Sequence, residues 1–194
     1  MKNFFKIIFA VCAMFIFLAF TKYTKRTFAT PVSTVVENKI EPIEIVLEEK
    51  KEIIIKDYYK FLYDLGHQES GNRYEVVNRF GYMGRYQFGK STLKTLKIKV
   101  DRETFLQNPQ LQDYAMHKLL CYNKRKLQNY IDKYEGKVVH GVLVTESGLL
   151  AAAHLGGAGS VRKWFRTGKV RQDGNGVKIT SYMVRFSGYK LDLT

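Results

Sequence analysis

Cysteine, proline and acidic residues are scarce in this sequence of 194 residues, which has two Cys, three Pro and 18 Asp+Glu against 32 Lys+Arg. Two cysteines cannot form a disulfide framework, and no Cys/His group has the spacing of metal ligands, so we expect no metal and no cofactor. The net charge of +14 predicts an anionic partner or environment. A hydrophobic content of 45% with 14% aromatic residues excludes a wholly disordered chain.

The N-terminus has the pattern of an export signal. Residues 1–29 contain five basic residues and no acidic one, and residues 7–20 are an unbroken apolar run. A basic start before a short apolar run is typical of a secretory signal peptide, and the longer segment 4–20 leaves an uncleaved membrane anchor open. We therefore expect an exported protein, periplasmic or associated with the cell envelope.

Residues 30–50 hold two of the three prolines and no aromatic residue, which predicts a tether leading into one domain at 51–194. Without residues 1–29 the chain keeps 27 basic and 18 acidic residues, a net charge of +9. Its single remaining cysteine, Cys121, has no neighbouring base and is interpreted as a core residue.

The patterning of the domain is mainly helical. Apolar residues spaced four, three and four apart from Ile54 to Leu65 predict a first helix. Asn108-Pro109 is a helix-start signal for a long helix that ends near Gly136, and Thr145 predicts another through Leu155. Further helices are expected from Asp101, from Ser160 to Gly168 and over 180–186, whereas 137–144 has a weak strand pattern and 70–89 is irregular.

Glu69 continues the apolar stripe of the first helix by one more turn. A carboxyl group at the end of a buried face needs a partner, a proton or a function. Partial burial and the negative end of the helix dipole both favour its protonated form. A protonated carboxyl is what a general acid needs to donate to a leaving oxygen.

Two segments together resemble the lytic transglycosylase (SLT, lysozyme-like) family. The first comprises Glu69-Ser70-Gly71-Asn72 and Gly81-Tyr82-Met83-Gly84-Arg85-Tyr86-Gln87-Phe88, which is similar to the family's Glu-Ser and Gly-Leu-Met-Gln. The second is Ala151-Ala152-Ala153-His154-Leu155-Gly156-Gly157-Ala158-Gly159, similar to Ala-Tyr-Asn-Ala-Gly-x-Gly. Both occur in the family's order, and the resemblance covers about residues 53–167.

The resemblance implies a single lysozyme-like domain with a glycan cleft. Glu69 matches the family's catalytic acid/base, which cleaves between N-acetylmuramic acid and N-acetylglucosamine in peptidoglycan and forms a 1,6-anhydro ring. Ser70 is expected to orient Glu69, and Gln87 to contact the sugar's N-acetyl or lactyl group. No second catalytic carboxylate is required, in contrast to the usual glycosidase pair.

Departures from the family pattern define further candidates. Arg85-Tyr86 replaces Leu-Met, and His154-Leu155 replaces Tyr-Asn. Tyr86 can stack on a sugar face, and His154 can contact the glycan or pack as a helix residue. Tyr82 and Arg85 are cleft-wall candidates from their place in the loop.

Two other functions remain open from the residues alone, and a third is set aside. A hydrolytic lysozyme would use the same Glu69 with water as acceptor, and a non-catalytic peptidoglycan-binding protein would keep only the fold. The positive charge by itself is compatible with nucleic acid, but the export signal and the absence of a nucleic-acid motif exclude that partner. Asp173-Gly174-Asn175-Gly176 lacks the remainder of a calcium loop and predicts a turn.

Overall fold

The computed structural model describes residues 55–193, within a compact unit that spans Lys51–Thr194. The predicted signal or anchor at 1–29 and the predicted tether at 30–50 lie outside the described residues. Among residues 55–193, no helix combines the length and the apolar composition that a membrane crossing requires.

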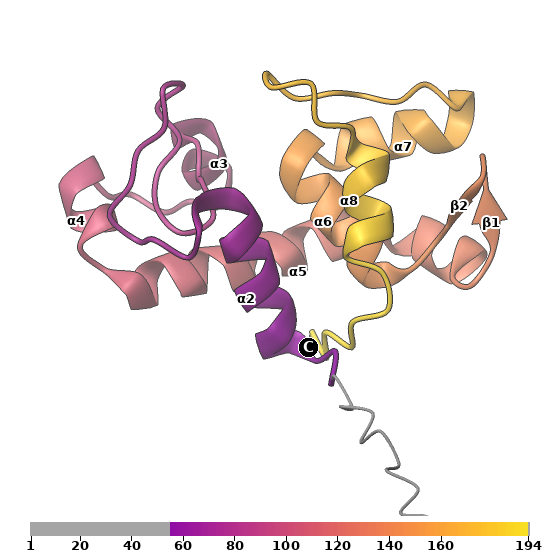
Figure 1. The fold of residues 1–194 in the computed structure, drawn as a ribbon, viewed down its shortest axis with the longest axis horizontal. Coiled ribbons are helices and arrows are strands. Elements are labelled where there is room, and N and C mark those ends of the chain that lie inside the picture. The colour runs from indigo at the N-terminus through magenta and orange to yellow at the C-terminus, as the bar shows by residue number, and fades with distance from the viewer. Residues whose placement is uncertain (1–54, 194) are drawn as a thin grey trace, which may run out of the picture. The chain divides into compact units, whose positions relative to one another are not determined.

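The described chain is mainly α-helical, as the sequence predicts, with one short hairpin (Figure 1). Its elements are α2 (Tyr58–Ser70), α3 (Lys90–Thr95), α4 (Arg102–Leu106), α5 (Pro109–Tyr134), β1 (Val138–Val139), β2 (Val142–Leu143), α6 (Glu146–Gly156), α7 (Ala158–Thr167) and α8 (Ile179–Arg185). The hairpin pairs Val138 with Leu143 in antiparallel register, within the segment where a strand pattern was predicted.

Side-chain caps begin several of these helices where the sequence predicts them. Asn108, Thr145 and Asp101 each accept a hydrogen bond from the backbone N–H three residues later. The first helix begins at Tyr58 with Asp57 as its cap, and Ile54, the first residue of the predicted stripe, lies outside the described residues.

Two helix predictions need correction. The expected start at Ser160 is wrong, because the chain already turns into α7 after Gly157, whose φ of 79° favours glycine. The short helix α3 was not predicted, because its N-cap is Gly89. Glycine has no side chain to cap a helix, so the sequence contains no start signal there.

Helix α5 connects the two sides of the domain. In Figure 1, α3, α4 and the loop before them lie toward one end of it, and α6, α7 and α8 lie toward the other end. The densest packing joins α6 to α8, where Gly148 lets the helices approach: a Cβ there would lie 2.5 Å from the carbonyl oxygen of Met183. This packing fixes α8 against the helix that carries His154.

Candidate active site

A cleft of about 780 Å³ is lined by the end of α2, the loop 71–89, α5, α6, the start of α7, the turn before α8 and α8. Four of the seven side chains selected from the sequence line it. These are Glu69, Tyr82, Gln87 and His154. The fold therefore brings the second motif to the carboxylate of the first, although the two segments are far apart in the chain.

Glu69 lies in the last turn of α2 with its side chain only 13% exposed. Its Oε1 accepts a hydrogen bond of 2.7 Å from the Tyr182 hydroxyl, and His154 Nε2 lies 3.5 Å from the same oxygen. Among the described residues nothing bonds Oε2. The two oxygens thus differ: Oε1 is held by the protein, and Oε2 has no protein partner among the described residues.

Tyr182 is the partner that the sequence did not reveal. It comes from α8, 113 positions after Glu69, and it is buried. Burial raises the pKa of Tyr182 well above its usual value, and the adjacent Glu69 charge and hydrogen bond raise it further. The phenol therefore stays protonated and acts as a permanent donor to Oε1.

His154 lies on α6 with its side chain 7% exposed and its ring edge against Phe88. Its Nδ1 is buried and has no hydrogen-bond partner among the described residues. The tautomer with hydrogen on Nε2 fits this geometry, because that hydrogen then faces Oε1 of Glu69. His154 thus lines the cleft, as predicted, and also contacts the carboxylate.

Aromatic rings form part of one cleft wall. Phe80 and Tyr82 are 50% and 45% exposed, and both line the cleft. Asn78 holds this segment, because its Oδ1 accepts from the backbone N–H groups of both residues. Exposed rings on a fixed loop offer the flat apolar surface on which a sugar face stacks.

Gln87 stands in the same wall with a left-handed backbone, φ 51°. Its Nε2 donates to the carbonyl of Gly84 at 2.9 Å, which fixes the amide in place. A fixed amide is a suitable reader of polar substituents on a sugar, because its orientation is not lost to rotation.

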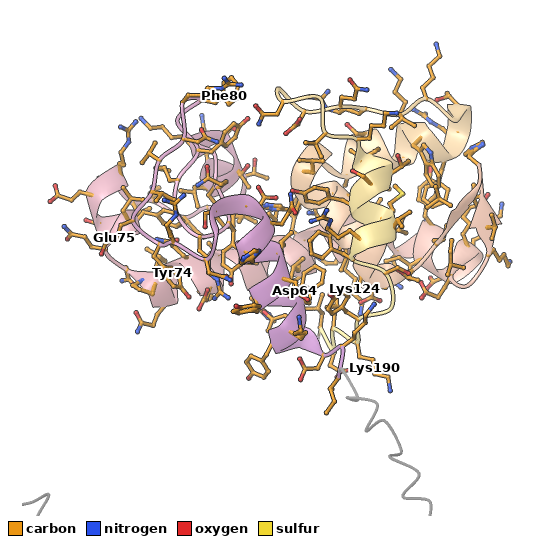
Figure 2. All side chains as sticks on the ribbon, in the orientation of Figure 1. Asp64, Tyr74, Glu75, Phe80, Lys124 and Lys190 are labelled. Carbon is orange, nitrogen blue, oxygen red and sulfur yellow. The ribbon has the colours of Figure 1, made fainter. Side chains whose placement is uncertain are left out.

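The loop that carries Arg79 and Phe80 forms one wall of the cleft, and the turn that carries Gly174 and Asn175 forms the other. The two walls touch at one edge of the cleft. Arg79 Nη2 donates to Asn175 Oδ1 at 2.9 Å, and the Phe80 ring lies against Gly174, where an added Cβ would be in van der Waals contact with it at 3.5 Å. Figure 2 shows Phe80 at the tip of its loop, beside the segment that precedes α8. A ligand entering from this edge has to separate these contacts.

The structure places Ser70 away from substrate. It is buried, its Oγ donates to the carbonyl of Arg85 at 2.8 Å, and it accepts from the N–H of Arg73 at 3.0 Å. No hydrogen bond joins it to Glu69 within the described chain. The expectation that Ser70 orients Glu69 and contributes to substrate binding is corrected: Ser70 fastens the end of α2 to the following loop.

Arg85 and Tyr86 are also absent from the cleft lining. Arg85 pairs with Asp113 at 3.2 Å and donates to the Tyr74 hydroxyl. Figure 2 shows Tyr74 well below the label of Phe80, on the side of the structure where α3 and α4 lie. Tyr86 is fully buried, and its hydroxyl donates to Asp113 at 2.8 Å. The prediction that Tyr86 stacks on a sugar is wrong, because a buried ring offers no face to a ligand.

Asp173 is the other carboxylate in the cleft lining besides Glu69. Its Oδ1 accepts from the backbone N–H groups of Asn175 and Val177 at 2.9 and 2.7 Å, which confirms the predicted turn. Within residues 55–193 no group of three His, Cys, Asp or Glu side chains is placed to hold a metal ion. The cleft thus has two carboxyl groups with an oxygen that no described residue bonds, and of these Glu69 is the one held by a side-chain donor, with its side chain only 13% exposed.

Comparisons of the chain with family models, with curated proteins and with solved structures gave no significant match. The function of the chain is therefore inferred from the resemblance of the two motifs and from the geometry of the cleft.

Proposed function

We propose that this chain is an exported peptidoglycan lytic transglycosylase in which Glu69 is the general acid and base. The observation that carries the proposal is the asymmetric carboxyl group: Oε1 is held by Tyr182 and Oε2 is open, in a cleft of about 780 Å³. A volume of this size accommodates several sugar rings. The mainly helical fold agrees with the fold class that the proposal requires.

The proposed reaction uses Glu69 twice. Protonated Oε2 donates its proton to the glycosidic oxygen as the bond to the muramyl C1 breaks, and the departing sugar leaves as an alcohol. The resulting carboxylate then accepts the proton of the muramyl 6-hydroxyl as that oxygen bonds to C1. The proton is returned to Glu69 and no water is consumed.

The backbone hydrogen bonds that hold Asp173 in its turn favour this route over hydrolysis by the usual pair. Retaining and inverting glycosidases commonly position two carboxyl groups across the scissile bond. Here the other lining carboxylate, Asp173, has one oxygen held by two backbone donors in a turn. A nucleophile supplied by the substrate itself removes the need for a second catalytic carboxylate.

Residues 1–29 complete the proposal, because peptidoglycan lies outside the cytoplasmic membrane and the enzyme has to reach it. We propose that this segment directs export and that segment 4–20 anchors the protein if it is not cleaved. The net charge of +9 on the remainder of the chain suits an anionic cell wall.

The test is digestion of purified peptidoglycan by the full-length protein and by Glu69→Gln, read by mass spectrometry. We expect muropeptides that end in 1,6-anhydromuramic acid from the native protein and none from the variant, because glutamine cannot transfer a proton. Reducing ends would show a hydrolytic lysozyme with the same acid. Binding without products from either protein would show a non-catalytic wall-binding protein.

A further inference from the structure

Helix α5 carries a buried amide in the cleft that the motifs do not account for. Asn123 is 2% exposed and lines the cleft. Its Nδ2 is buried with no partner, and neither end of the amide forms a hydrogen bond with another described residue.

An unpaired buried amide is costly, and native proteins pair nearly all such groups. Gln112, two to three turns earlier on the same helix, shows the ordinary case. Its Oε1 accepts from the N–H of Arg85 at 2.8 Å, and its Nε2 donates to the carbonyls of Phe105 and Tyr74 at 2.8 and 3.0 Å. One buried amide of α5 thus holds the fold together, and the other has its polar group without a partner beside a cleft.

The surroundings of Asn123 indicate what would pair with it. Leu119 precedes it by one helical turn on the same face, and Ala153 and Leu155 of α6 line the same cleft. An amide in a cleft that also presents apolar side chains can pair with a group that has a carbonyl, an N–H and a methyl. The acetamido substituent of an N-acetylated sugar has these three features.

We propose that Asn123 binds the acetamido group of the glycan and so makes this cleft selective for N-acetylated sugars. The inference rests on the proposed function, since it specifies how that cleft reads its substrate. It also explains why leucine can occupy position 155, where the resembling family has asparagine. In this chain the amide comes from Asn123 on α5 and not from α6.

The experiment compares two neutral β-1,4-linked ligands that differ at C2, chitotetraose with acetamido groups and cellotetraose with hydroxyls. Binding is measured by calorimetry with the full-length protein and with Asn123→Leu. We expect the native protein to prefer chitotetraose and the variant to lose about tenfold of that preference, the effect of one buried hydrogen-bonding group. An unchanged preference in the variant overturns the inference and leaves the proposed function intact.

Thermal unfolding supplies a second readout, because it distinguishes an asparagine that binds the ligand from an asparagine that stabilises the fold. Asn123→Leu should leave the melting temperature unchanged or raise it, because it removes an unpaired buried amide. The matched variant Gln112→Leu should lower it strongly, because it strands the groups that the amide satisfies. A large fall in melting temperature for Asn123→Leu overturns the inference, and failure of the native protein to bind either sugar overturns the proposed function.

Discussion

The Tyr182 hydroxyl is the contact whose removal tests the catalytic geometry most directly. As Glu69 donates its proton, negative charge develops on the carboxyl group, and the 2.7 Å bond from Tyr182 to Oε1 strengthens. Tyr182→Phe removes that donor and little else, because the ring stays packed in the core. His154 remains 3.5 Å away and cannot replace a short hydrogen bond.

The magnitude follows from the charge on the acceptor. A hydrogen bond to a charged group contributes about 1.5–3 kcal/mol, so losing it in the transition state lowers kcat by roughly 10- to 100-fold. The KM should change little, because Tyr182 stabilises charge that develops after binding. Initial rates of peptidoglycan digestion by the full-length protein give both constants.

Tyr189→Phe is the matched control. It also removes a phenol that donates to a carboxylate, here Asp64 Oδ2 at 2.6 Å, and neither Tyr189 nor Asp64 lines the cleft. We expect kcat to fall in Tyr182→Phe and to stay near the native value in Tyr189→Phe. A kcat for Tyr182→Phe within a factor of about two of the native value would refute the assigned role.

The other predictions concern the stability of the domain and access to the cleft. Lys60 and Tyr189 donate to Asp64, and although burial alone acts in the opposite direction, these bonds lower the pKa of Asp64 below its ordinary value of 3.8. Their contribution to the free energy of unfolding is therefore present above about pH 4 and is lost as the pH falls through the folded pKa. Tyr189→Phe should lower the free energy of unfolding by about 1 kcal/mol at pH 7 and by progressively less in acid, as measured by urea unfolding. Arg79→Ala removes a contact between the cleft walls and should raise the rate on intact sacculi several-fold more than the rate on short glycan strands; equal changes on both substrates would contradict a barrier at that edge.

The helices could be predicted from the sequence because their signals are local. Asn108 and Thr145 each cap a backbone N–H three residues later, so the interaction and its cause lie within one turn. Glu69 could be found from the sequence for the same reason, because it continues an apolar stripe whose Phe61 and Leu65 are buried. Local periodicity therefore found the carboxyl group but not its partners.

The loop 71–89 could not be read in this way, because a loop has no period that assigns side chains to faces. Gly84 and Gln87 both have positive φ, and the turn between them directs Arg85 and Tyr86 toward Asp113 on α5. Gln87 faces the cleft while its two predecessors do not. The order of residues alone contains no information about that reversal.

The two buried polar side-chain atoms that have no hydrogen-bond partner in the described chain are evidence that this cleft binds a polar ligand. They are His154 Nδ1 and Asn123 Nδ2, and both residues line it. Buried polar groups left unpaired by the fold are rare and costly, so their occurrence in one cleft is not what packing alone would select. A polar ligand that pairs them would offset this cost upon binding, and the open oxygen of Glu69 lies in the same cleft, where such a ligand would meet it.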